Sequence, residues 1–130
     1  MTARSVILGL NALMFIVFGL GFIFAPAAVT PMFLGVAAPG GDLLVDMRAT
    51  YGGLSLAVGL YMAFCTLCRP HLYLGLMLSL LIYGALLVAR GVAILAEASV
   101  GQAMYQSLVL ELVMTILFAA LYLTGRRRPA

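Results

Sequence analysis

Charged residues are scarce in this sequence. Only 8% of the 130 residues are charged and lysine is absent, whereas about 25% of an ordinary soluble domain is charged. Apolar residues make up 65% of the chain. Because so little polar surface cannot cover a folded body of this size in water, the composition excludes a soluble globular protein. It indicates instead a protein whose solvent is lipid.

Motifs of common catalytic chemistry are absent as well. The sequence contains no dinucleotide-binding GxGxxG, no phosphate-binding loop and no HExxH motif. His71 is the only histidine, and no Ser-His-Asp arrangement is indicated around it. The net charge of +3 comes from arginines in short loops, which attract anionic lipid and do not indicate nucleic-acid binding. These features argue against a hydrolase, a nucleotide-dependent enzyme and a nucleic-acid-binding protein.

Long apolar stretches predict four membrane-spanning helices. A helix needs about 20 apolar residues to cross a hydrocarbon core of about 30 Å. The expected spans are residues 5–25, 45–67, 71–96 and 104–124, and the stretch between the first two is expected to lie in the membrane interface. Pro26 and Pro70 follow the first and second spans, and Gly125 ends the fourth. The sequence therefore predicts an all-α integral membrane protein, a single domain over residues 1–130 folded as an up-down-up-down four-helix bundle.

Arginines in the short loops predict the orientation of this bundle. Cytoplasmic loops carry the excess of positive charge. Arg4, Arg69 and the run Arg126 to Arg128 fall on one side of the predicted bundle, whereas Asp42 and Glu97 fall on the other. We therefore expect both termini in the cytoplasm.

Four ionisable residues lie inside the predicted spans, where a charge is costly and marks either a function or a buried pair. At 1.5 Å per residue, Arg90 lies about 9 Å and Glu111 about 10 Å below the outer ends of their spans. Arg48 lies roughly 6 Å below the outer end of its span, with Asp46 just above it. The matched depths predict one formally neutral polar layer in which Arg90 pairs with Glu111 and Arg48 with Asp46. Helical spacing adds Tyr51 to the face of Arg48.

Two interpretations of this layer remain open. In the first, the arginine–carboxylate pairs fix the helices against one another and bind nothing. In the second, the layer is a pocket open to the outer face, where two guanidinium groups receive a carboxylate or phosphate. The ligand would be a small anionic amphiphile such as a lipid, a fatty acid or a quinone-like molecule. The predicted ligand-binding residues are Asp46, Arg48, Tyr51, Arg90 and Glu111.

Cys65 and Cys68 form a C-x-x-C motif, with His71 three residues further on. Two thiols at this spacing can form a disulfide, which makes a membrane thiol oxidoreductase a third alternative. However, the motif falls on the predicted cytoplasmic side, and no second cysteine pair is present to relay electrons. As a metal site, the three residues lack a fourth ligand. We therefore expect two dispensable, lightly packed thiols, no metal and no cofactor.

A recurring family pattern runs through the chain: Asp46-x-Arg48-Ala49-x-Tyr51-Gly52-Gly53, then Gly59, Arg90-Gly91 and Glu111-Leu112-Val113. It resembles the pattern of a bacterial membrane family catalogued as domain of unknown function 4345. The resemblance implies a multi-pass protein of the bacterial inner membrane with no assigned reaction. More loosely, the chain is similar to small DoxX-like membrane proteins, some of which accompany redox partners. The cysteine pair lies outside the family pattern.

Three functions therefore remain after the sequence alone. The first is the binding or carrying of a small anionic amphiphile. The second is a structural or accessory role in a homo-oligomer or larger membrane complex, for which the small residues of the second span offer a close-packing face. The third is thiol oxidoreduction by the cysteine pair.

Overall fold

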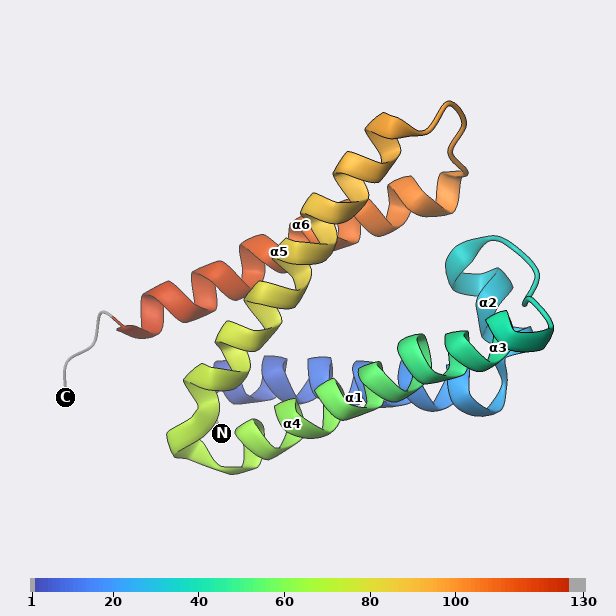
Figure 1. Ribbon diagram of the computed structural model, residues 1–130. Coiled ribbons are helices and arrows are strands. Elements are labelled where there is room, and N and C mark those ends of the chain that lie inside the picture. Colours follow the sequence, from blue (N-terminus) through green and yellow to red (C-terminus); the bar gives the residue numbers. More distant parts are fainter. Residues whose placement is uncertain (1, 127–130) are drawn as a thin grey trace. The chain divides into compact units, whose positions relative to one another are not determined.

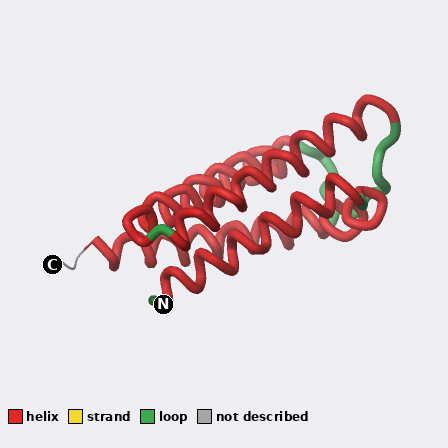
Figure 2. Tube along the Cα trace, turned by 90° about the horizontal axis from the view of Figure 1, so that it is seen from below, coloured by secondary structure: helices red, strands yellow, loops and turns green. Residues whose placement is uncertain are grey.

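Helices account for nearly all of the described chain. The computed structural model describes residues 2–126 and contains no strand within that range (Figures 1 and 2). Four helical stretches are long and apolar enough to cross a membrane: Ala3–Phe24, Gly41–Leu67, Arg69–Ala96 and Gln102–Gly125. The prediction of an all-α, multi-pass membrane protein is confirmed. The orientation stays a prediction, and Arg127, Arg128 and the side chain of Arg126 lie outside what the structure describes.

The helices form two compact units, an N-terminal unit (Met1–Arg69) and a C-terminal unit (Pro70–Ala130). The N-terminal unit contains helices α1 (Ala3–Phe24), α2 (Pro26–Leu34) and α3 (Gly41–Met47), the π-helix η1 (Arg48–Leu54) and helix α4 (Ser55–Leu67). The second span is therefore made of α3, η1 and α4 in direct succession. The short helix η2 (Arg69–His71) leads into the C-terminal unit, which contains helices α5 (Leu72–Ala96) and α6 (Gln102–Arg126).

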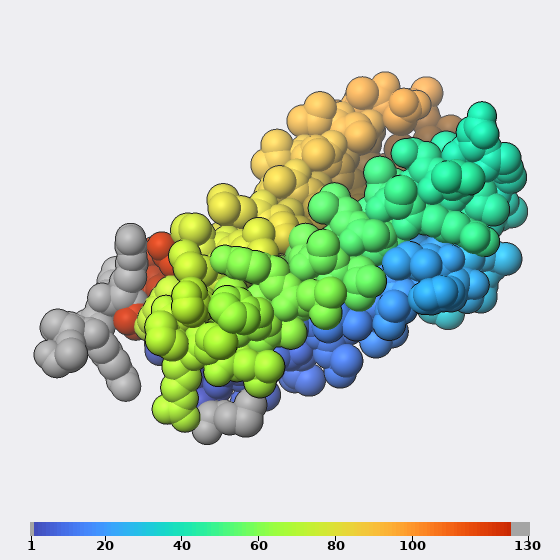
Figure 3. All heavy atoms as spheres, turned by 60° about the horizontal axis from the view of Figure 1, so that its bottom comes forward, coloured from blue at the N-terminus to red at the C-terminus, as the bar shows by residue number. Residues whose placement is uncertain are grey.

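Glycines bring α1 and the second span into backbone contact. A Cβ added at Gly19 would lie 2.6 Å from the backbone nitrogen of Leu56, and one at Gly59 would lie 2.8 Å from that of Ile16. Gly9 of α1 likewise meets Thr66, so earlier residues of α1 meet later residues of the second span, and the two helices run antiparallel and side by side (Figures 1 and 3). Without a hydrophobic driving force between helices in lipid, such close packing of small residues is a main source of association.

Helix α2 folds back onto the end of α1. Pro26 occupies its first turn, where the missing N–H costs nothing. Thr30 is fully buried, and its hydroxyl donates to the sulfur of Met47 at 3.5 Å, which joins α2 to α3. Phe33 lies edge-on to Phe18 of α1, with ring centroids 5.0 Å apart. The first part of the connecting segment is therefore a packed helix of the N-terminal unit.

Aromatic contacts and a short loop join α5 to α6. The buried Tyr83 ring stacks on Phe118 with centroids 5.8 Å apart and planes 11° apart, and Tyr73 lies edge-on to Tyr122 at 6.4 Å. The beginning of α5 therefore lies against the end of α6, and the two helices run antiparallel. This arrangement places the second half of α5 beside the first half of α6, where Arg90 and Glu111 are found.

The π-helix is the main departure from the sequence-based expectation. It spans the seven residues Arg48–Leu54, most of which belong to the family pattern, and the spacing argument treated them as ordinary α-helix. A π-helix is rare and forms hydrogen bonds from residue i to i+5 instead of i to i+4. The segment contains Gly52 and Gly53, and glycine has the weakest α-helix preference after proline. It also lies where Gly52 meets the backbone of α1.

Candidate functional site

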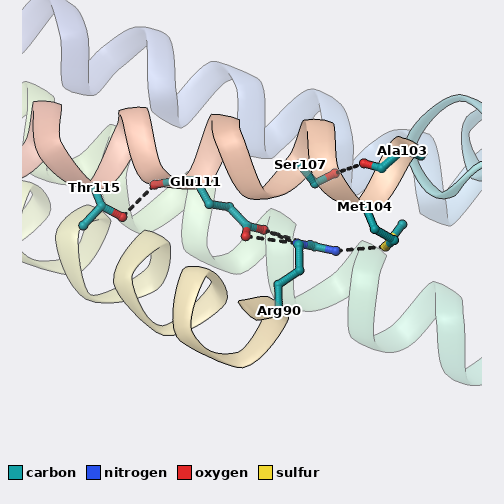
Figure 4. Close-up of polar contacts among 6 residues, drawn as sticks. All are labelled: Arg90, Ala103, Met104, Ser107, Glu111 and Thr115. Atoms are coloured by element: carbon teal, nitrogen blue, oxygen red, sulfur yellow. Dashed lines mark hydrogen bonds and ion pairs between the residues drawn. The ribbon is translucent and has the colours of Figure 1, made fainter. Parts of the chain in front are cut away.

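Arg90 of α5 and Glu111 of α6 form an ion pair (Figure 4). The Arg90 Nε–H donates to both carboxylate oxygens of Glu111 at 2.9 and 3.0 Å, and Nη2 lies 2.8 Å from Oε1. The guanidinium thus presents its side-on fork of N–H groups, the geometry that binds a carboxylate most strongly. The Glu111 side chain is only 6% exposed and that of Arg90 25%. The structure brings together these two residues, as their matched depths predicted.

The remaining polar groups around this pair are occupied within their own helices (Figure 4). The Ser107 hydroxyl donates to the Ala103 carbonyl at 3.0 Å, and the Thr115 hydroxyl donates to the Glu111 carbonyl at 2.6 Å. Each hydroxyl has a single proton to donate, so neither supplies a hydrogen bond to the Glu111 carboxylate. Arg90 Nη1 donates to the sulfur of Met104 at 3.2 Å. The charge of Glu111 is therefore balanced by Arg90, within the same pair of helices.

Arg48 lies in the other unit, at the first position of η1. Its side chain is exposed, and within residues 2–69 its guanidinium makes no hydrogen bond or ion pair. Asp46 is also exposed, and the expected pair between Asp46 and Arg48 is not formed within this part of the chain. Residues two apart on a helix point to different sides, which separates the two charges. Within residues 2–69 the guanidinium of Arg48 is therefore exposed and not ion-paired.

Tyr51 belongs to an aromatic group in the N-terminal unit. Its ring stacks on Phe22 of α1, with centroids 5.4 Å apart and planes 26° apart, and it remains 45% exposed. Phe22 also lies 4.7 Å from Phe18 and 6.4 Å from Phe33. Helical spacing could have indicated Phe18 and Phe22, which are four residues apart, whereas Phe33 joins them only because α2 folds back. In a π-helix Arg48 and Tyr51 are less closely aligned than their α-helical spacing suggested.

The five predicted ligand-binding residues thus fall into two groups. Asp46, Arg48 and Tyr51 lie in the N-terminal unit, and Arg90 and Glu111 lie in the C-terminal unit. The hypothesis that all five contact one ligand stays a prediction. The two arginines differ in one respect: Arg90 forms an ion pair, whereas Arg48 forms none within residues 2–69.

The two cysteines of the C-x-x-C motif lie at the end of the second span, Cys65 in α4 and Cys68 directly after it. Cys65 and Cys68 form no disulfide within residues 2–126. Cys65 is fully buried in α4, so the expectation of light packing is wrong for this residue. Within residues 2–126, no group of three or more histidine, cysteine or acidic residues could hold a metal ion. The absence of a cofactor stays an expectation.

The comparison with known families gives one match. The family described as Domain of unknown function (DUF4345) matches residues 3–122, which include the whole of η1 and both members of the Arg90–Glu111 pair. No curated protein and no solved structure matches the chain.

Proposed function

This chain belongs to that family of unknown function, and from this premise we propose that it is an integral membrane protein that binds the anionic head group of a small amphiphile at Arg48. The amphiphile would be a lipid, a fatty acid or a similar membrane-soluble anion. The compartment we propose is the bacterial inner membrane, with both termini in the cytoplasm. The distribution of Arg4 and Arg69 supports this orientation.

The observation that carries this proposal is the exposed guanidinium of Arg48, which forms no ion pair within residues 2–69. Arg48 lies seven residues after the start of α3 at Gly41, which places it about 10 Å along the span. An arginine at the centre of a membrane helix costs about 2.5–3.5 kcal/mol, and the cost falls when the side chain reaches a polar partner. An anionic head group would supply that partner.

The chemistry of the guanidinium suits such a ligand. Its five N–H donors form planar forks that match a carboxylate or phosphate group, and its charge persists at every physiological pH. The exposed ring of Tyr51, stacked on Phe22, offers apolar surface in the same unit. A molecule with an anionic head and an apolar body would therefore find partners for both parts on the N-terminal unit.

A structural role is the second candidate, and the C-terminal unit favours it for its own charged pair. Arg90 and Glu111 neutralise each other with three short N–O contacts between α5 and α6. Removal of either partner would leave a charge in a mostly buried site. We propose that this pair fixes the register of α5 and α6 and that the ligand is held elsewhere.

Lipid analysis of the purified protein tests the proposal. Wild-type protein, Arg48→Gln and Arg69→Gln would be purified in a mild detergent, and co-purified anionic amphiphiles would be quantified by mass spectrometry. Arg69 is also an exposed arginine of the N-terminal unit, so its variant controls for the loss of one positive charge. We expect Arg48→Gln to lose at least roughly nine-tenths of the anionic amphiphile, a tenfold effect equivalent to about 1.4 kcal/mol, whereas Arg69→Gln retains it. Equal retention by all three proteins would refute the proposal.

A further inference from the structure

We infer that one side of helix α2 is a lipid-contact surface that lies among the acyl chains of the membrane. This surface, called here the outer face of α2, consists of Ala27, Ala28, Pro31 and Met32, all of which are exposed. Its partner is the hydrocarbon part of a lipid and not the anionic head group proposed for Arg48. The inference therefore stands independently of the proposed function.

The first step is the position of α2 along α1. A Cβ added at Gly21 would lie 3.0 Å from a side-chain carbon of Val29, and the rings of Phe33 and Phe18 lie 5.0 Å apart. These two α1 residues lie three and six residues before the end of the helix at Phe24, about 5 and 9 Å along its axis. Helix α1 is long and apolar enough to cross the membrane. Helix α2 therefore packs beside the last two turns of a membrane span.

The second step is the chemistry of the outer face. Thr30 is the only polar residue of α2, and its side chain is fully buried with its hydroxyl on the sulfur of Met47. The outer face is apolar along its whole length, and Met32 is 74% exposed. A helix that lies between lipid and water carries a polar or charged side toward the water. Because α2 has no such side, the acyl-chain region suits it better than the interface that the sequence suggested.

The third step is the backbone at the two ends of α2. In hydrocarbon, backbone N–H and C=O groups need partners within the protein. The Ala25 N–H, in the turn from α1, donates to the Gly21 carbonyl at 2.8 Å, and Pro26 has no N–H. At the other end, the Gly35 N–H donates to the Pro31 carbonyl at 3.1 Å, and the positive φ of 71° at this residue suits glycine. These ends place backbone groups on partners inside the chain, as contact with lipid requires.

The connection between α5 and α6 has the opposite chemistry. Glu97 and Ser99 are exposed there, and the segment 97–101 is not helical. Exposed charge and non-helical backbone call for water. This connection therefore supplies a reference for a water-exposed position in the same chain.

Tryptophan fluorescence tests the inference, because the chain has no tryptophan of its own. Three variants in phosphatidylcholine vesicles each carry one reporter: Met32→Trp on the outer face, Leu13→Trp near the middle of α1, and Ala98→Trp in the α5–α6 connection. Leu13 is 57% exposed, and Ala98 is exposed. Each variant would be quenched separately by acrylamide in the water and by lipid brominated on its acyl chains, either near the head group or near the chain end. Circular dichroism checks the fold, and Ala28→Trp is a second reporter on the same face.

We expect acrylamide to quench Met32→Trp and Leu13→Trp at least about threefold less than Ala98→Trp, because lipid separates the first two from water. Lipid brominated near the head group should quench Met32→Trp most, whereas bromine near the chain end should quench Leu13→Trp most. Emission from Met32→Trp should be shifted to shorter wavelength relative to Ala98→Trp.

Two outcomes would overturn the inference. Acrylamide quenching of Met32→Trp and Ala28→Trp as strong as that of Ala98→Trp would place the outer face in water. Weak quenching of both α2 reporters by acrylamide and by brominated lipid alike would mean that protein covers the face, either another part of this chain or a second copy.

Discussion

Removal of one member of the Arg90–Glu111 pair leaves the other charge without its partner between α5 and α6. Breaking a buried ion pair on one side costs about 3–5 kcal/mol. The Glu111 side chain is 6% exposed and the Arg90 side chain 25%, so the carboxylate has less access to water than the guanidinium. Arg90→Met should therefore cost about 5 kcal/mol and Glu111→Leu about 3 kcal/mol.

The double variant Arg90→Met with Glu111→Leu isolates the interaction. Replacing a buried pair by apolar residues of similar volume is often neutral or stabilising, so we expect its stability within about 1 kcal/mol of wild type. From these costs the coupling energy of the cycle should be at least about 7 kcal/mol in magnitude. A second cycle of Arg90→Met with Glu97→Leu serves as the control, because Glu97 is exposed at the end of α5 and its effect should add independently.

Unfolding by SDS titration in bicelles, followed by circular dichroism, measures these free energies. The reasoning predicts non-additivity for Glu111 and additivity for Glu97. A coupling energy between Arg90 and Glu111 that cannot be distinguished from zero would refute it, since the three N–O contacts of 2.8–3.0 Å would then contribute nothing to stability.

Two further predictions concern orientation and the thiols. A reporter fused after the C-terminus or within the Arg69 turn should report the cytoplasm, because short-loop arginines set orientation; a periplasmic signal would place the cysteines on the oxidising side and revive the redox hypothesis. Cys68→Ala should leave the free energy of unfolding unchanged within about 0.5 kcal/mol, whereas Cys65→Ala, at a fully buried position, should cost about 1 kcal/mol. Thiol labelling should find both cysteines reduced in cells, and a disulfide there would contradict this expectation.

The sequence was sufficient to predict the Arg90–Glu111 pair because both residues lie in regular α-helices. Depth along α5 and α6 follows from counting residues at 1.5 Å each. Because a charge inside a span is costly, opposite charges at equal depth on two neighbouring spans are expected to pair. The four membrane-length helices followed for a similar reason, since length and apolar composition decide whether a helix can cross a bilayer.

The same counting failed in the second span because its period changes at Arg48. Sequence periodicity assumes i to i+4 bonding, and η1 replaces it with i to i+5 over seven residues. The adjacent Gly52 and Gly53 were a visible signal of weak α-helix preference, but glycine pairs are also common where membrane helices simply pack closely. The contact of Phe33 with Phe18 could not be predicted for another reason, because it depends on α2 folding back onto α1.

The two intramembrane arginines show how one side chain takes different roles in different settings. Arg90 faces a carboxylate on the neighbouring helix, and the pair satisfies its own charge. Arg48 forms no ion pair within residues 2–69, and Asp46, two residues earlier, points to another side. A chain that needed only a tether at Arg48 could have placed an acidic residue one turn away. The absence of such a pair at Arg48 within residues 2–69 is the reason for proposing an anionic partner from outside the chain.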